Sequence, residues 1–171
     1  MRILVQKFGG TSLATEQARE FVIRHIARER DRGYALVVVV SAMGREGDPY
    51  ATDTLLRMIA SNGDALPARE KDLLLGCGEI ISTAVLVSKL RSQGISATGL
   101  TGGAAGIVTD STFGSARILD VRPEVLIETL QRGEVAIVAG FQGRTENSEL
   151  TTLGRGGSDT SATALGAALR A

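Results

Sequence analysis

RILVQKFGG, residues 2–10, is the stretch from which the fold can be worked out. Its first seven residues are mostly apolar and two glycines follow them, a pattern typical of a buried strand that enters a tight turn. From Ala14 to Arg32 apolar residues recur at helical spacing, and Gly33 ends the helix. ALVVVV, residues 35–40, predicts a second buried strand. Strand, helix and strand in this order form a βαβ unit, so the two strands are expected to be parallel.

The rest of the chain continues this alternation. Residues 101–117 are rich in Gly and Ser and are expected to hold loops and short strands, and residues 146–153 a hairpin or loop. The fold class is therefore α/β, a three-layer αβα sandwich with a mainly parallel sheet. No strand follows the last helix, so the domain is expected to be truncated. The further helices are expected over residues 54–60, 67–75, 79–91 and 123–131 and from Ser158 onward, and the further strands over residues 97–100 and 135–139.

Composition excludes several classes of protein. The 171 residues are 43% hydrophobic, enough for one substantial core. The 19 basic and 19 acidic side chains balance, so neither a nucleic acid nor a membrane surface is expected as a partner. No apolar run approaches the roughly 20 residues that span a bilayer, and the first residues do not resemble a signal peptide, so the expected location is cytoplasmic. Cys77 is the single cysteine and His25 the single histidine, which argues against a disulfide and against a His/Cys metal site.

KFGGTS, residues 7–12, is the first candidate site. A strand ends there and a helix begins, and the two glycines allow backbone N–H groups to approach an anion. The spacing matches neither a Walker sequence nor the dinucleotide-binding pattern. The alternative is a plain turn with Lys7 in solvent. We favour the anion site, because a lysine in an apolar strand is costly unless an anion meets its ammonium group.

GRGGSD, residues 154–159, is the second candidate site. It fails the GxGxxG pattern because Asp159 takes the position of the third glycine. Arg155 is suited to bind a carboxylate or phosphate through two hydrogen bonds. Ser158 and Asp159 fit two interpretations equally well, an ordinary helix cap or contact with a ligand.

Four further residues have weaker patterns. Ser41 follows the second strand, where open α/β sheets bind ligands, although a serine there can also cap a turn. In GCGE, residues 76–79, the residues alone favour Glu79 as a first-turn glutamate that compensates a helix dipole. Cys77 is expected to be a small buried apolar residue, and His25 to be structural or exposed to solvent.

Six motifs occur in an order that resembles the aspartokinases, over nearly the whole chain. The loop SAMGREGDPYATD, residues 41–53, is most similar to the Bacillus type, and especially to its diaminopimelate-sensitive isozyme. The resemblance implies the amino acid kinase or carbamate kinase-like fold, with residues 1–171 as its N-terminal, aspartate- and phosphate-binding part and without the ATP-binding half and the ACT regulatory domains. The motifs are KFGGTS, VVVVSAMG, GCGEIIS, ATGLTGGAAG, IVAGFQG and TTLGRGGSDTSATALGAAL.

The implied reaction is ATP-dependent phosphorylation of the side-chain carboxylate of L-aspartate, which gives 4-phospho-L-aspartate for the synthesis of lysine, diaminopimelate, threonine and methionine. Mg²⁺ would accompany the nucleotide, with no metal ligand expected from the chain. By the resemblance, Lys7 meets the transferring phosphoryl group and Asp159 orients that lysine or the metal. The other implied roles are contact with ATP or its phosphates for Phe8, Gly9, Gly10, Ser41 and Ser158, and aspartate binding for Thr52, Glu79, Arg155, Gly156, Gly157 and Ser158.

Two other functions remain open. Another amino acid kinase, such as an acetylglutamate, glutamate or uridylate kinase, would share the fold, although GRGGSD argues against it. A non-catalytic amino-acid-binding module is the alternative outside the enzymes. On its own the chain is expected to have little or no kinase activity, because much of the nucleotide site would be absent, and an exposed sheet edge leaves a homodimer open.

Overall fold

Four parallel strands form the main sheet of the computed structural model, which describes residues 1–61 and 63–171. Across the sheet the order is β1, β2, β6 and β3, with Lys7 of β1 opposite Val39 of β2. The mainly parallel sheet is confirmed, and the carboxyl ends of its strands lie at one edge. The strands span Arg2–Phe8 (β1), Tyr34–Val40 (β2), Ala97–Leu100 (β3) and Val135–Ala139 (β6).

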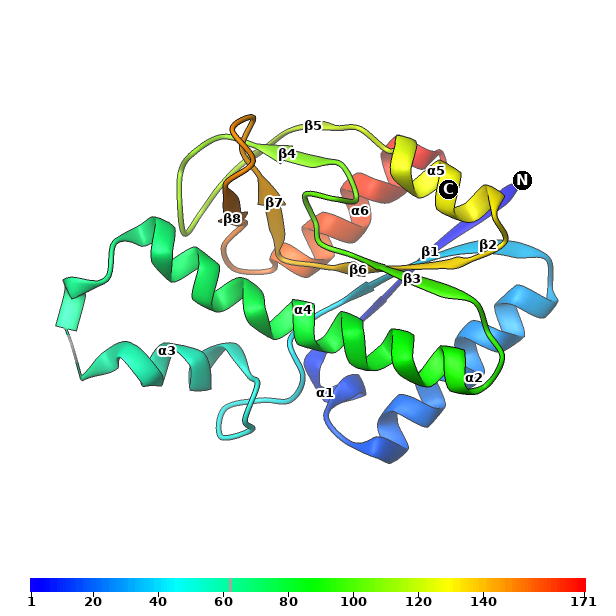
Figure 1. Ribbon diagram of the computed structural model, residues 1–171, viewed down its shortest axis with the longest axis horizontal. Coiled ribbons are helices and arrows are strands. Elements are labelled where there is room, and N and C mark those ends of the chain that lie inside the picture. Colours follow the sequence, from blue (N-terminus) through cyan, green and yellow to red (C-terminus); the bar gives the residue numbers. More distant parts are fainter. Residues whose placement is uncertain (62) are drawn as a thin grey trace.

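Helices cover both faces of this sheet, so the predicted three-layer αβα sandwich is confirmed (Figure 1). Helices α2 (Glu16–Asp31) and α4 (Ala68–Ser92) pack on one face, where Ile23, Ile26 and Leu86 are buried. Helices α5 (Glu124–Gln131) and α6 (Gly157–Leu169) pack on the other. The valines of β2 alternate between these two cores, since successive side chains of a strand point to opposite faces.

A second, smaller sheet lies beside the main one and explains the stretches that the sequence left as loops or short strands. It has the order β5, β4, β7 and β8, and β7 and β8 form the expected hairpin. The segments next to its strands β7 and β8, at Phe141 and at Gly154 to Arg155, line the cleft described below. Its strands span Ile107–Thr109 (β4), Ile118–Val121 (β5), Gln142–Arg144 (β7) and Leu150–Thr152 (β8).

Helix α4 corrects two expectations. The helices predicted over residues 67–75 and 79–91 are one continuous helix of 25 residues. Position 78 inside this helix is a glycine because the helix packs closely against Ala42: a Cβ at Gly78 would come within 2.7 Å of the Cβ of Ala42. The expectation that no apolar stretch approaches membrane-spanning length is also wrong, since α4 meets that criterion by length and composition. Its buried residues pack against the sheets, as in the core helix of a globular domain.

The remaining short elements are α1 (Gly10–Leu13), α3 (Thr52–Ala60) and the 3₁₀ turn η1 (Gly63–Ala65). Cys77 is exposed rather than buried, and its thiol donates to the carbonyl of Leu73 at 3.3 Å. The reason is helical phase, because Gly76 and Gly78 on either side of it face the core. His25 is exposed on α2, so of the two expectations, a structural histidine or a solvent-exposed one, the second is confirmed.

Candidate active site

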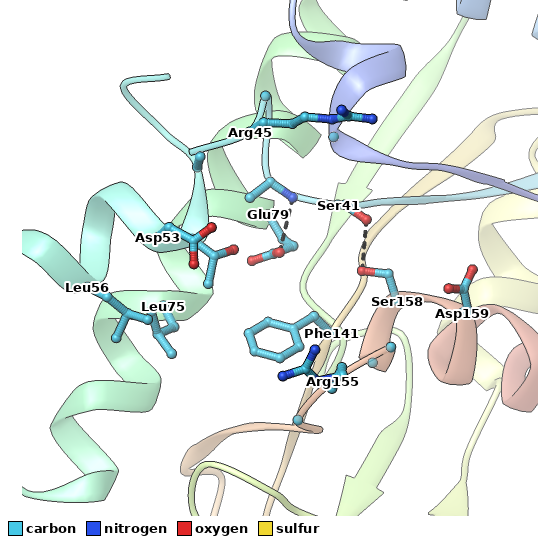
Figure 2. Close-up of a pocket in the computed structure, with 18 of the residues that line it drawn as sticks. Ser41, Arg45, Asp53, Leu56, Leu75, Glu79, Phe141, Arg155, Ser158 and Asp159 are labelled. Atoms are coloured by element: carbon cyan, nitrogen blue, oxygen red, sulfur yellow. Dashed lines mark hydrogen bonds between the residues drawn. The ribbon is translucent and has the colours of Figure 1, made fainter. Parts of the chain in front are cut away.

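A cleft of about 830 Å³ opens where β1, β2 and β6 end, and it brings the predicted site residues together (Figure 2). Parallel α/β sheets generally bind ligands at this edge. Two predicted residues are not part of the lining: the half-buried Phe8 packs against the core, and Gly9 is next to Lys7, where a Cβ would lie 3.6 Å from Lys7 Nζ. The predicted residues that line the cleft are Lys7, Gly10, Ser41, Thr52, Glu79, Arg155, Gly156, Gly157, Ser158 and Asp159.

The turn after β1 lies directly against the loop after β2. The amide of Gly44 donates to the carbonyl of Gly10 at 2.9 Å, and the amide of Ser41 donates to the carbonyl of Phe8 at 3.1 Å. A Cβ on Gly10 would come within 2.4 Å of the carbonyl oxygen of Gly44, so only glycine fits at this close approach. The glycine of KFGGTS is therefore required by packing, whether or not an anion binds.

Lys7 points into the cleft and is paired with the first turn of α6. Its Nζ lies 3.1 Å from Oδ1 of Asp159, which is itself largely exposed. An exposed pair of this kind contributes little to stability. The plain-turn interpretation of KFGGTS, with Lys7 directed away into solvent, does not fit this position among the cleft residues.

Ser158 joins α6 to the end of β2. Ser41 Oγ donates to Ser158 Oγ at 3.0 Å, although the two residues are 117 positions apart in sequence. The interpretation of Ser158 as a helix cap is wrong, since α6 is preceded by Gly156 and has no side-chain cap. Gly156 has φ 75°, a left-handed conformation that favours glycine, and it lets the chain turn sharply between Arg155 and the helix.

Glu79 is the buried charge of the cleft. It lies in the middle of α4 and is 2% exposed, so its interpretation as a first-turn glutamate is wrong. Oε1 accepts a hydrogen bond from the amide of Ala42 at 3.0 Å, whereas Oε2 has no partner among the described residues. Burial raises the pKa of the Glu79 carboxyl to about 7, and the hydrogen bond from Ala42 opposes part of that rise.

A buried carboxylate with one unpartnered oxygen costs free energy. Such a group is therefore prepared to accept a hydrogen bond or a positive charge from a ligand in the cleft. Figure 2 shows the Glu79 carboxylate, the Phe141 ring and the Arg155 guanidinium around the same space. Arg155 is exposed in the wall of the cleft that residues 154–157 form, and its N–H groups are available to a ligand.

Part of the cleft lining was not predicted from the sequence. Phe141 is the second residue after β6, beyond Gly140, and has φ 66°, unusual for a residue other than glycine. Its position after a buried strand was a usable signal, the same one that selected Ser41. The other missed residues come from the loop 42–53, from α3 and α4, and from the Gly-rich turn: they are Ala42, Gly44, Arg45, Glu46, Ala51, Asp53, Leu56, Leu75 and Gly154.

Asp72 supports the wall that carries Arg155. It is fully buried on α4, and its carboxylate accepts hydrogen bonds from the amides of Gly114 at 3.0 Å and Thr152 at 2.8 Å and from the hydroxyl of Thr152 at 2.8 Å. Thr152 ends β8, three residues before Arg155. Asp72 could not be selected from the sequence, because its donors come from distant segments.

The cleft thus combines a lysine, an arginine and a buried carboxylate with two backbone segments, the turn after β1 and the loop after β2, that pack closely against each other. A model of the amino acid kinase family matches residues 2–171 of the chain. The chain belongs to the amino acid kinase family. The predicted fold and the resemblance to aspartokinases are therefore confirmed.

Curated relatives of this amino acid kinase chain are aspartokinases. Aspartokinase 1 of Bacillus subtilis is 51% identical over 171 residues, which is 100% of this chain and 42% of that protein. Aspartokinase of Thermus thermophilus is 46% identical over the same length, 41% of that protein. The chain therefore spans about two fifths of the length of these relatives.

Solved aspartate kinases have the same architecture as this member of the family. The enzyme from Synechocystis superposes with a TM-score of 0.81 at 43% identity and covers 99% of this chain, which in turn covers 27% of that chain. Aspartokinase III of E. coli in complex with aspartate and ADP superposes with a TM-score of 0.80 at 25% identity, over 99% of this chain and 47% of that one.

Proposed function

We propose that this chain is the aspartate- and phosphate-binding part of an aspartate kinase, which transfers a phosphoryl group from ATP to the side-chain carboxylate of L-aspartate. The observation that carries the proposal is that Lys7, Glu79 and Arg155, from three distant segments, line one cleft. Aspartate has two carboxylates and one ammonium group, and ATP is a polyanion. Two cationic side chains and one buried carboxylate match this set of charges.

On the aspartate side, the guanidinium of Arg155 would bind a carboxylate through two parallel hydrogen bonds. The unpartnered Oε2 of Glu79 would accept a hydrogen bond from the ammonium group, which would stabilise the ionised form of a carboxyl whose pKa is raised to about 7. Thr52, at the start of α3, would contribute a hydroxyl to the same end of the cleft.

On the phosphate side, Lys7 would neutralise the charge of the transferring group, while Gly10, Ser41 and Ser158 line the adjacent wall. Mg²⁺ bound to ATP takes most of its ligands from phosphate oxygens and water, so it needs few from the protein. Among the described residues no three His, Cys, Asp or Glu side chains gather as a metal site. Asp159 is the carboxylate next to Lys7 and is the residue that would face this ion.

The reaction requires no activated nucleophile from the protein. A carboxylate oxygen of aspartate forms a bond to the γ-phosphorus as the bond between that phosphorus and the β,γ-bridging oxygen breaks, which releases ADP. Phosphoryl transfer of this kind depends mainly on positioning and on charge neutralisation. Lys7 and Arg155 supply charge, and the closely packed turns supply position.

The test is binding of L-aspartate to the purified chain, measured by isothermal titration calorimetry, together with hydroxylamine trapping of an acyl phosphate in the presence of Mg-ATP. We expect L-aspartate to bind and L-glutamate and N-acetylglutamate to bind at least about tenfold more weakly. Arg155→Lys should weaken aspartate binding by about tenfold, because the second hydrogen bond is lost. Arg170→Lys, at the far end of α6, is the matched control.

Aspartate-specific hydroxamate would establish the reaction directly and would contradict the expectation that the chain alone is inactive. Binding without hydroxamate would support the aspartate-binding role. Tighter binding of N-acetylglutamate or glutamate than of aspartate would favour another amino acid kinase, and no binding of any of the three would overturn the proposal.

A further inference from the structure

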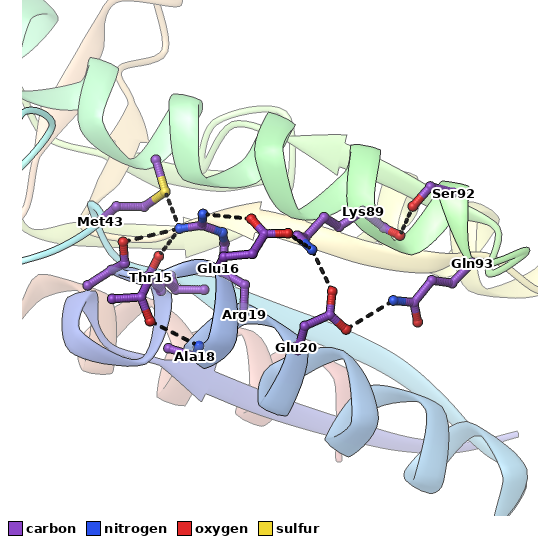
Figure 3. Close-up of polar contacts among 11 residues, drawn as sticks. Thr15, Glu16, Ala18, Arg19, Glu20, Met43, Lys89, Ser92 and Gln93 are labelled. Atoms are coloured by element: carbon purple, nitrogen blue, oxygen red, sulfur yellow. Dashed lines mark hydrogen bonds and ion pairs between the residues drawn. The ribbon is translucent and has the colours of Figure 1, made fainter.

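Arg19 lies on α2, outside the cleft, at the centre of a polar network between α1, α2, α4 and the loop after β2 (Figure 3). Its side chain is 15% exposed, well buried for an arginine. No part of the proposed reaction uses it. Its partners nevertheless belong to the two segments that form the phosphate side of the cleft.

The first partner is the short helix that begins at the glycine turn. Arg19 Nη1 donates to the carbonyl of Leu13 at 2.6 Å and to the carbonyl of Ala14 at 3.3 Å. The last carbonyls of a helix have no partner within it, and a cation that reaches them stabilises its end. α1 is only one turn long and follows Gly9 directly, so the guanidinium anchors the far end of the glycine turn.

The second partner is the loop after β2. Arg19 Nη1 also lies 3.7 Å from Sδ of Met43, a buried residue. The next residue, Gly44, donates its amide to the carbonyl of Gly10. Arg19 therefore contacts both of the segments that this hydrogen bond joins.

A second layer of charges holds Arg19 in this position. Arg19 Nη2 lies 3.3 Å from Oε2 of Glu16, and the other oxygen of Glu16 is paired with Lys89 of α4. Lys89 also lies 2.5 Å from Oε1 of Glu20. Figure 3 shows this series of contacts running from α4 through Glu16 to Arg19.

We propose that Arg19 is a positioning residue for phosphate binding: it holds the Gly9–Gly10 turn against the Met43–Gly44 loop, and Glu16 and Lys89 fix its orientation. The identity of this turn as the phosphate side of the cleft rests on the proposed function. The positioning of the two segments does not. A planar guanidinium suits the task, because its separate nitrogens reach the carbonyls and the carboxylate at fixed angles, which a lysine ammonium cannot do.

The first experiment measures amide hydrogen exchange by NMR in the complete chain. In Arg19→Met we expect the amides of Ser12 and Gly44 to exchange at least about tenfold faster, because their acceptors at Gly9 and Gly10 lose support. Amides in the middle of α2 should be unchanged. The matched control is Arg24→Met on the same helix, whose guanidinium stacks on Phe21 and should leave both amides unaffected.

The second experiment compares two ligands of the wild type and the variants. Arg19→Met should weaken binding of inorganic triphosphate by about tenfold and that of L-aspartate by less than about twofold, a difference that general destabilisation would not produce. Glu16→Gln should reproduce the effect in part and serves as the variant if Arg19→Met does not fold. Glu16 is largely exposed, so this substitution leaves the core intact.

The possible outcomes separate the role of Arg19 from the proposed function of the cleft. Unchanged exchange at Ser12 and Gly44 in both variants, or an equal increase along the whole of α2, would overturn the role of Arg19. An equal loss of triphosphate and aspartate affinity would mean that Arg19 only stabilises the fold, and would overturn its role in phosphate binding. If the wild type binds neither ligand, the proposed function fails, and hydrogen exchange alone decides whether Arg19 positions the turn.

Discussion

Asp72 receives both hydrogen bonds that Thr152 can donate, one from its backbone amide and one from its hydroxyl, each at 2.8 Å. Through this contact α4 holds the end of β8, from which the chain continues to Arg155. This fully buried carboxylate forms no ion pair among residues 1–61 and 63–171, and two backbone N–H groups and one hydroxyl satisfy it instead. The position of the Arg155 wall therefore depends on a residue that does not touch the cleft.

Asp72→Ala should lower the free energy of unfolding by about 3 kcal/mol, because it leaves buried donors of Gly114 and Thr152 without acceptors. Asp72→Asn should cost less than about 1 kcal/mol, since its carbonyl oxygen can accept from both amides while its NH₂ donates to the Thr152 hydroxyl. Urea unfolding of both variants tests this. Equal losses in the two variants would mean that the charge matters rather than the hydrogen bonds.

Glu79→Gln should stabilise the protein at pH 8 and have little effect at pH 5. The pKa of Glu79 is raised to about 7 in the folded protein, so the carboxyl is protonated at pH 5 and carries a buried charge at pH 8. Because the folded state holds its proton more tightly than the unfolded state, stability falls as pH rises from about 4.5 to 7. Removing the charge should return about 1 to 3 kcal/mol at pH 8.

The same variant should bind L-aspartate at least about tenfold more weakly at pH 8, since a neutral amide cannot form an ion pair with an ammonium group. Thermal unfolding and calorimetric titration at pH 5 and pH 8 measure both effects. A loss of stability at pH 8, or unchanged aspartate binding, would contradict the assignment of Glu79 as a destabilising charge kept for a ligand.

Gly10→Ala should destabilise the chain by about 2 kcal/mol, because the added Cβ meets the backbone oxygens of Gly44 and Ala42, which cannot rotate away. Gly166→Ala is the matched control. It lies inside α6 with its nearest neighbour 3.9 Å from the added carbon, so it should stabilise by about 0.5 to 1 kcal/mol. Chemical denaturation of both proteins should therefore show shifts of opposite sign, and shifts of the same sign would refute the packing argument.

Asp159→Asn should change the free energy of unfolding by less than about 0.5 kcal/mol, because its ion pair with Lys7 is largely exposed. It should tighten binding of inorganic triphosphate without Mg²⁺ by about threefold, since a carboxylate that repels the anion is removed. With Mg²⁺ present we expect this gain to disappear. Titrations in the two conditions test the assignment, and weaker binding of metal-free triphosphate would contradict it.

The sheet and its covering helices were predictable because each element has its own pattern of apolar residues. The βαβ unit from Arg2 to Val40 needs no distant contact to be recognised. The continuity of α4 was not predictable, since glycines at positions 76 and 78 lower helix propensity and predict a break. Packing against Ala42 outweighs that preference, and the sequence does not show which residues will meet there.

The residues of the candidate site and its surroundings likewise fall into those that were predictable from the sequence and those that were not. Residues within motifs, such as Lys7 and Arg155, were found because a strand end or a Gly-rich turn marks them in the sequence. Asp72 and Arg19 were not found, because their partners are brought together only by the fold. Phe141 had a local signal, its place two residues after the end of a buried strand.

The unbroken helix α4 also constrains how the length of the chain can vary. Asp72, Glu79 and Lys89 lie on this one helix, and they contact β8, the loop after β2 and α2 respectively. Deleting or inserting one residue between them would rotate the later contacts by about 100° relative to the earlier ones. Changes in length within α4 are therefore strongly disfavoured, whereas the exposed loop from Arg45 to Tyr50 can lengthen or shorten without disturbing this alignment.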